Sequence, residues 1–191
     1  MKLLVRPSAL LAHLNRIGES IATVAVGGFA NASGSFDTAV GYGADASGGD
    51  STALGSGSLA TGYNSVAVGG SLLGLLPTEA SGDFSTAVGG GAWAPGTNAT
   101  AIGNLASATA DNSIALGGDS VADREDSVSV GSAGSERQIT NVAAGSAATD
   151  AVNVRQLQGA INQIDALDVF AVTYDDDGAG GADYRRITLG G

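Results

Sequence analysis

The residues that could carry catalytic chemistry in this chain are few and do not form a constellation. The 191 residues include no Cys, which excludes cysteine nucleophiles, thiolate zinc sites and disulfides together. The only histidine is His13, near the start of the chain and outside the repeats described below. A Ser-His-Asp triad or a histidine metal site would need a base beside the serines, which the repeats lack. We therefore expect no catalytic residue and no enzymatic activity.

Two further features have residue types suited to ligand binding. Asp175, Asp176 and Asp177 could offer hard oxygens to a cation, but the usual calcium-loop spacing is absent, which favours a solvated acidic turn. The glycine clusters lack a following Lys-Ser/Thr pair and recur at a fixed period, which indicates turns rather than a phosphate-binding loop. We expect neither a metal nor a cofactor.

Charge and composition restrict the partners and the core. With 8 Lys+Arg against 19 Asp+Glu, the net charge of −11 argues against nucleic acid and anionic membranes as partners. The chain is 43% hydrophobic but only 5% aromatic, so its core must be thin or shared between chains. It has no run of about 18 apolar residues and no secretory signal, so an exported protein would be represented here by a fragment.

A 14-residue repeat organises most of the chain. A triplet of a small residue, an aliphatic residue and Gly recurs eight times at intervals of 14 residues, with one interval of 20. The triplets begin at Ala25, Ala39, Ala53, Ala67, Ala87, Ala101, Ala115 and Ser129. The longer interval indicates an insertion near residues 71–77.

The columns of the repeat indicate strands and turns. The residue before each triplet is β-branched, which suits a strand, and alternation then places Ser, Ala and Gly on one face and the aliphatics on the other. A second column of alanines comprises Ala32, Ala46, Ala60, Ala80, Ala94, Ala108 and Ala122. We assign the glycines that follow five of them to turns that need positive φ: Gly34, Gly48, Gly62, Gly82 and Gly96.

These columns predict a solenoid whose coils each contain two short strands and two tight turns, stacked into two parallel sheets. The small side chains meet inside, and the aliphatic column points outward, where leaving it in water would forfeit stabilisation. We therefore expect a homo-oligomer with a shared core. Its predicted members in the roll are Val26, Val40, Leu54, Val68, Val88, Ile102, Leu116 and Val130.

The two ends of the chain depart from the repeat. Thr149 or Asp150 can cap a helix whose a/d seam is Val154, Leu157, Ile161 and Ile164, and this seam extends the predicted shared core. Phe170–Tyr174 and Arg185–Leu189 indicate a small hairpin. At the other end, Ala9, Leu10, Leu14 and Ile17 have helical spacing, although a leader added for expression is an equal alternative.

The repeats, followed by the segments 137–142 and 150–157, resemble the head and neck of a YadA-like trimeric autotransporter adhesin. The resemblance implies a left-handed parallel β-roll in a homotrimer. It divides the chain into an unassigned leader (1–20), a head (21–134), a neck (135–157), a coiled-coil segment (158–169) and a small β module (170–191). It also implies display on the bacterial surface through a C-terminal outer-membrane barrel that the chain does not contain.

The resemblance also nominates ligand-binding residues. The collagen-binding sequence described for the family matches residues 64–71, including Asn64, Ser65 and Ser71, and a second, weaker copy begins at Asn112. The same residues also satisfy the coil template, so an architectural role is the competing interpretation. Two local departures from the repeat supply further candidate ligand-binding residues. These are Leu72 and Leu73 in the insertion and Trp93 in an outward column.

We expect a surface adhesin head that binds host matrix proteins such as collagen, fibronectin or laminin, or else a spacer in an adhesin stalk. Two other solenoid classes fit poorly. A β-helix acyltransferase would need hexapeptide periods and a catalytic His. An ice-binding solenoid would need a regular Thr array, which Val and Ile interrupt here.

Overall fold

The computed structural model describes residues 16–17, 22–168, 172–176, 179 and 182–189. These fall into two compact units, 1–137 and 138–191, which are described separately. His13 and Asp177 lie outside the described residues. In the part of the chain that the structure describes, no helix is long and apolar enough to span a membrane.

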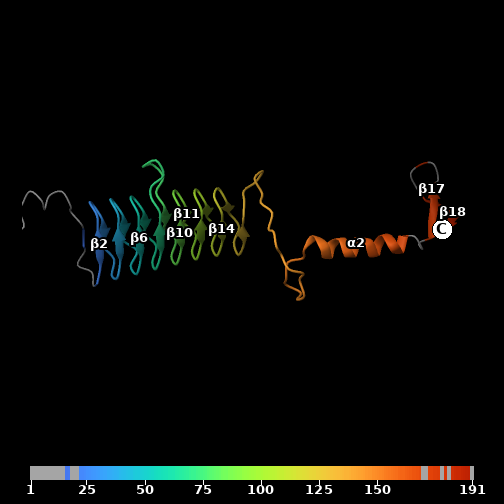
Figure 1. The fold of residues 1–191 in the computed structure, drawn as a ribbon, viewed down its shortest axis with the longest axis horizontal. Coiled ribbons are helices and arrows are strands. Elements are labelled where there is room, and N and C mark those ends of the chain that lie inside the picture. The colour runs from blue at the N-terminus through green and yellow to red at the C-terminus, as the bar shows by residue number, and fades with distance from the viewer. Residues whose placement is uncertain (1–15, 18–21, 169–171, 177–178, 180–181, 190–191) are drawn as a thin grey trace, which may run out of the picture. The chain divides into compact units, whose positions relative to one another are not determined.

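The first unit is a roll of two eight-stranded parallel sheets, as the repeat predicts (Figure 1). We call one of them the inner-stripe sheet, because the aliphatic column on its outer surface is the predicted shared core of the oligomer. It contains β2 (Val24–Val26), β4 (Thr38–Val40), β6 (Thr52–Leu54), β8 (Val66–Val68), β10 (Thr86–Val88), β12 (Thr100–Ile102), β14 (Ile114–Leu116) and β16 (Val128–Ser129). The second sheet contains β1 (Arg16–Ile17), β3 (Asn31–Ala32), β5 (Asp45–Ala46), β7 (Leu59–Ala60), β9 (Glu79–Ala80), β11 (Trp93–Ala94), β13 (Ser107–Ala108) and β15 (Val121–Ala122).

The register of the sheets repeats the sequence columns. Ala39 pairs with Ala53 in one sheet and Ala46 with Ala60 in the other. The six extra residues after β8 do not disturb this register, because Val68 still pairs with Val88. The insertion therefore leaves the stack as a loop and the next coil resumes in phase.

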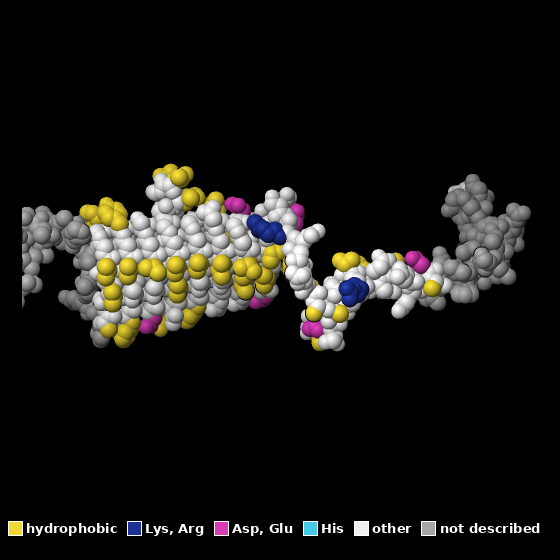
Figure 2. Space-filling model, in the orientation of Figure 1, with side chains coloured by type: hydrophobic (Ala, Val, Ile, Leu, Met, Phe, Trp, Pro, Cys, Tyr) yellow, Lys and Arg dark blue, Asp and Glu magenta, His cyan; other side chains and the backbone are white. Residues whose placement is uncertain are grey.

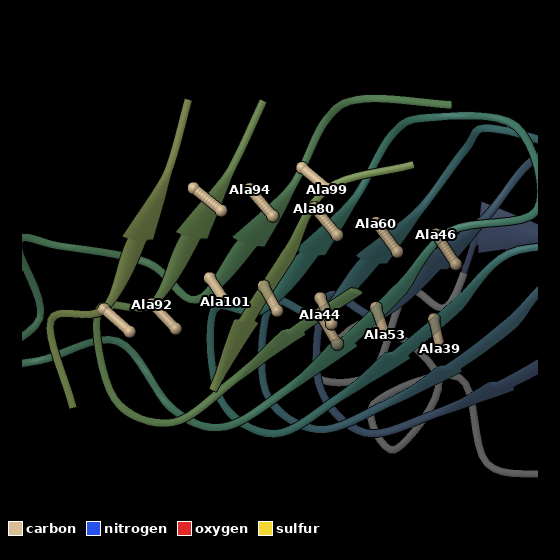
Figure 3. Packing of buried hydrophobic residues seen from close by; sticks show 14 of the residues in the cluster. Ala39, Ala44, Ala46, Ala53, Ala60, Ala80, Ala92, Ala94, Ala99 and Ala101 are labelled. Carbon is tan, nitrogen blue, oxygen red and sulfur yellow. The ribbon is translucent and has the colours of Figure 1, made fainter. Parts of the chain in front are cut away.

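The interior of the roll is made almost entirely of alanine (Figure 3). Both alanine columns are buried apart from the half-buried Ala25, and serines of the strand column, such as Ser51 and Ser113, are also fully buried. Asp37 takes the place of one of these serines, and its carboxylate accepts hydrogen bonds from the Gly34 and Ser51 backbone N–H groups. Only side chains of this size fit between two sheets this close together, so the interior provides little hydrophobic area per residue.

The prediction of positive φ at Gly34, Gly48, Gly62, Gly82 and Gly96 is wrong. Positive φ falls instead on the glycines that end the triplets, such as Gly41 (φ 142°) and Gly55 (φ 127°). The five glycines of this column are instead required by close packing: a Cβ on Gly48, for example, would overlap the carbonyl oxygen of Gly62 in the next coil. The glycine column therefore reflects the distance between backbones rather than their dihedral angles.

The helical interpretation of the first residues is wrong for Ile17. Arg16 and Ile17 form β1, which pairs in parallel with Asn31 and Ala32 of β3. The first complete coil leaves unpaired backbone groups at its edge, and a short strand satisfies them. Ala9, Leu10 and Leu14 lie outside the described residues.

The second unit contains the helix α2 (Val154–Asp168) and a hairpin of β17 (Val172–Asp176) and β18 (Ala182–Leu189). The predicted helix cap is wrong, because Asn153 caps α2 by accepting a hydrogen bond from the Gln156 N–H at 3.1 Å. Asp150 instead accepts the Ser146 and Ala147 N–H groups of the preceding turn. The helix therefore begins inside the segment expected to be neck. The hairpin is confirmed, while Phe170 lies outside the described residues.

Candidate adhesive and assembly surfaces

An unbroken row of hydrophobic side chains runs along the outside of the inner-stripe sheet (Figure 2). Each coil contributes one member, since the residue after the buried alanine of every three-residue strand points outward. Val26, Leu54, Ile102 and Leu116 are 55%, 44%, 39% and 46% exposed. The predicted members Val40, Val68, Val88 and Val130 are half-buried. A soluble chain rarely leaves so continuous a stripe in water, so the row is suited to burial against other protein.

The seam of α2 is likewise uncovered in the single chain. Val154, Leu157, Ile161 and Ile164 are 80%, 57%, 39% and 64% exposed. Their spacing of three and four residues places them on one face of the helix. An isolated helix of this length is marginal in water, so this face also requires a partner.

The segment 64–71, which matches the family's collagen-binding sequence, divides between the surface and the interior. Ser65 is fully buried and its hydroxyl faces the inside of the roll, so it is not available to a ligand on the outer surface. Asn64 is exposed and lies in a turn with φ 52°, and Asn112 lies in the equivalent turn with φ 54°. Asn tolerates this left-handed conformation better than most residues, which supplies an architectural reason for both asparagines.

The insertion forms a short loop that projects from one edge of the roll. Leu72 and Leu76 pair across its base, with the Leu72 N–H donating to the Leu76 carbonyl at 2.7 Å. Thr78 is fully buried beneath it and donates to the Gly89 carbonyl at 2.6 Å. Ser71 and Leu72 are half-buried, whereas Leu73 and Leu75 are 88% and 80% exposed. The tip therefore presents leucine side chains to the surroundings.

A hollow of about 310 Å³ lies beside this loop. Its lining is mainly apolar and includes Leu76, Pro77, Trp93 and Leu105, with Glu79 as the one ionisable group. Trp93 is 44% exposed there, so its ring forms part of an open surface. The structure thus brings the insertion and Trp93, which the sequence nominated separately, to the same place, whereas Asn64 lies in a turn on the opposite edge.

The turns that lead into the inner-stripe sheet carry aromatic and acidic side chains that sequence analysis missed. Phe36, Tyr63 and Phe84 are 56%, 46% and 52% exposed. Tyr63 and Phe84 meet edge to face, with their ring centroids 5.6 Å apart. Asp50 accepts a hydrogen bond from the Tyr63 hydroxyl, which raises the pKa of Tyr63. Phe36, Asp50 and Phe84 share the turn column of Asn64 and Asn112, and Tyr63 lies one residue before that column. A search for surface aromatics in turn positions would have found them.

Arg137 is another residue whose role the sequence did not reveal. Its guanidinium donates to the Ser120 hydroxyl at 2.9 Å and to the Val130 carbonyl at 2.7 Å, and it also reaches the Gly118 carbonyl. These acceptors belong to the last coils of the roll, where no further coil is stacked to satisfy them. Arg137 therefore closes the end of the solenoid.

The described residues contain no cluster of three or more His, Cys, Asp or Glu side chains that could hold a metal ion. Asp175 and Asp176 are in strand β17 rather than in a turn.

Comparison with family models finds the YadA head domain repeat at residues 20–44, 46–71, 80–106 and 108–133. The coiled stalk of trimeric autotransporter adhesins matches residues 138–175. The head matches omit residues 72–79, which contain most of the insertion.

Among solved structures, the collagen-binding domain of the Yersinia adhesin YadA is similar to this chain, with 35% identity and a TM-score of 0.60. The similarity covers 74% of this chain and 76% of that domain. The C-terminal YadA-like domain of a Burkholderia pseudomallei protein is 27% identical, with a TM-score of 0.39.

A curated relative is the autotransporter adhesin EhaG of Escherichia coli O157:H7, which is 50% identical over 56 residues. The match covers 29% of this chain and 3% of that adhesin, so the chain spans only a small part of its relative.

Proposed function

The chain belongs to the YadA-like trimeric autotransporter adhesins, and from this premise we propose that its roll is the adhesive head of a homotrimer that binds host extracellular matrix. Members of this family are adhesion proteins rather than enzymes, in agreement with the lack of a catalytic constellation in the sequence. The family also supports an extracellular location, on a passenger anchored in the outer membrane.

The observation that carries the proposal is the uncovered hydrophobic row of the inner-stripe sheet. It continues from Val26 to Leu116 without a polar interruption, and the α2 seam from Val154 to Ile164 offers a second uncovered surface. Three copies that turn the row inward would bury it between their rolls, and a coiled coil of three helices would separately bury the seam. The second sheet and the turns of each roll would then face outward, available to a ligand.

Within this head, Asn64 and Ser71 are the residues we assign to a collagen-like ligand, with Asn112 as a weaker second site. Both asparagines are exposed in the turns, and residues 64–71 match the family's collagen-binding sequence. The similar YadA domain is a collagen-binding domain, which supports this assignment. The hollow beside Trp93, with Leu72 and Leu73 in the adjoining loop, is a further contact surface.

Binding to immobilised collagen, fibronectin and laminin tests the proposal. We expect the intact trimer to bind at least one of the three, and Asn64→Ala to weaken binding to collagen. Asp126→Ala is the matched control, because Asp126 occupies the same turn position with φ 52° but lies outside both copies of the motif. Equal binding by both variants would assign Asn64 to architecture, and a trimer that binds no matrix protein would make the roll a spacer.

A further inference from the structure

We propose that the exposed leucines of the insertion dock on an aromatic pair of the partner subunit and so close each boundary of the homotrimer. The leucines are Leu73 and Leu75, and the pair is Tyr63 and Phe84. The loop therefore binds a second copy of this chain. The proposal rests on the proposed homotrimer, with the hydrophobic row turned inward, and it names the partner of this contact surface.

Each strand of the inner-stripe sheet lies between two edges of the roll. Turns that lead into the strands form the entry edge, and turns that leave them form the exit edge. The insertion projects from the exit edge, beside the hydrophobic row (Figure 2). A three-residue strand keeps the two edges at least about 10 Å apart within one chain. Side chains of one edge are therefore not covered by those of the other.

A three-fold axis brings the two edges together. Three narrow sheets that turn their rows toward one axis form the sides of a triangular prism, with the turns at its corners, where they adjoin the next subunit and still face outward. In a closed ring the contact is head to tail, so the exit edge of one subunit meets the entry edge of the next. Because the row runs from Val26 to Leu116, the roll lies along the axis, and equivalent coils have equal height.

The side chains of the two edges match at equal height. At β4 both edges are aromatic, with Phe36 on the entry edge and Tyr42 on the exit edge, 56% and 64% exposed. At β6 both edges are polar and present Asp50 and Ser56. Both edges are also polar at β12 and β14, where the exposed residues are Asn98 and Asn104, then Asn112 and Asp119. A boundary between subunits explains this agreement, because apolar groups would then cover apolar groups.

The insertion and the aromatic pair occupy the same height of the roll. Tyr63 precedes β8 and Phe84 precedes β10, so the pair spans two coils of the entry edge. The insertion leaves β8 and leans toward the turn after β10, where Leu76 and Gly91 line one hollow. The loop therefore covers the same two coils on the exit edge.

Both surfaces are suited to this contact. Leu73 and Leu75 form the most exposed part of the loop, and water contact of these side chains is lost when they dock. Tyr63 and Phe84 already meet edge to face, and the Asp83 side chain accepts the Tyr63 N–H at 2.9 Å. Because the pair is held in place before docking, it loses little conformational entropy when the loop binds.

The contact also changes how the assigned ligand residues are arranged. Asn64 and Ser71 lie at opposite ends of β8 in one chain, one on each edge. Docking of the loop brings the edge with Ser71 to the edge with Asn64 of the partner subunit. A ligand that uses both residues would therefore contact two subunits at their boundary.

Pairs of introduced cysteines test the contact, since the chain contains no Cys of its own. Two matched variants combine residues of equal height: Leu73→Cys with Phe84→Cys, and Tyr42→Cys with Phe36→Cys. The swapped variants, Leu73→Cys with Phe36→Cys and Tyr42→Cys with Phe84→Cys, are the controls. They place the cysteines at β4 and β10, which are three strands or about 14 Å apart, whereas a disulfide needs Cα atoms within about 7 Å.

We expect oxidation of the matched variants to give a covalent trimer on a denaturing, non-reducing gel, while the swapped variants stay mostly single chains. Light scattering under reducing conditions measures beforehand that each variant is a trimer. Equal cross-linking of matched and swapped variants, or a trimeric Leu73→Cys, Phe84→Cys variant that does not cross-link, would overturn the contact and leave the homotrimer intact. A folded monomer of the unmodified chain would instead overturn the homotrimer and the contact together.

Discussion

Asp37 and Ser51 are joined across two successive coils by a pair of hydrogen bonds inside the roll. One Asp37 carboxylate oxygen accepts the Ser51 N–H at 2.9 Å and the Ser51 hydroxyl at 2.8 Å, and both side chains are fully buried. The other oxygen accepts the Gly34 N–H at 2.6 Å. The carboxylate thus links three donors at a position where most other coils have serine.

Removal of this carboxylate should destabilise the roll. We expect Asp37→Ala to lower the free energy of unfolding by about 3 kcal/mol, because buried donors lose their acceptor. Thermal unfolding followed by circular dichroism measures the loss. Asp37→Ser restores the residue that the column has elsewhere and should cost less; an equal cost for both variants would argue against the hydrogen bonds as the cause.

Glycine substitutions separate the two reasons why the coils contain glycine, which are close packing against the next coil and a positive φ. Gly48→Ala should destabilise by about 3 kcal/mol or more, because its Cβ would overlap the backbone of Gly62, which cannot move aside. Gly43 has φ 64° and open space around it, so Gly43→Ala should cost only about 1 kcal/mol. Chemical denaturation of the two variants compares them, and a larger loss at Gly43 would contradict the packing explanation.

The repeat predicts the roll well because every coil obeys the same rules. Alternation along Ser-Thr-Ala-Leu-Gly at residues 51–55 is enough to predict which side chains are buried, and the second column of alanines follows from the same period. Features that depend on distances between coils were not predictable. One example is the contact between Gly48 and Gly62, and another is the strand at Ile17. Both depend on how far apart two backbones lie, and a column of the sequence gives no such distance.

The candidate site was less predictable than the fold. Motif matching nominated Ser65, which alternation along the strand places inside the roll. Asp150 and Asn153 are both good capping residues, and only the structure shows which turn each one closes. Phe36 and Phe84 lie in one turn column whose residue type varies among the coils, so no periodic pattern indicates aromatic rings there.

The capping of α2 provides a test in the second unit. Asn153→Ala should lower the stability of this helix by about 1 kcal/mol, since it removes the acceptor for the Gln156 N–H. It also removes the hydrogen bond from the Asn153 side chain to the Val142 carbonyl. Helical circular dichroism during thermal unfolding measures the change, and unaffected helix melting would show that the cap contributes nothing.

The turn before the helix should respond to acid. The Ala147 and Ser146 N–H groups lower the pKa of Asp150, so its ionised form is favoured in the folded turn. The resulting stabilisation is present above the usual aspartate pKa of about 3.9 and is lost as pH falls through the lower folded value. NMR titration of the Asp150 carboxyl carbon measures this. Asp150→Asn should remove the acid dependence of the turn, and its persistence in that variant would assign it elsewhere.

A charge in the hydrophobic row should prevent assembly. We expect Val68→Asp to shift the chain from trimer to monomer or to unfold it, because three buried carboxylates would lie close to one axis. Leu59→Asp is the control, since Leu59 lies in the outward column of the second sheet where other coils have Asp45 and Glu79. Analytical ultracentrifugation distinguishes the two, and loss of the trimer in both variants would indicate a general loss of stability.

Light scattering on the unmodified chain measures the stoichiometry most directly. The uncovered row and the α2 seam predict a particle of three times the 18.5 kDa chain mass, stable on dilution. A folded monomer with the strand content of the roll would contradict a shared hydrophobic core.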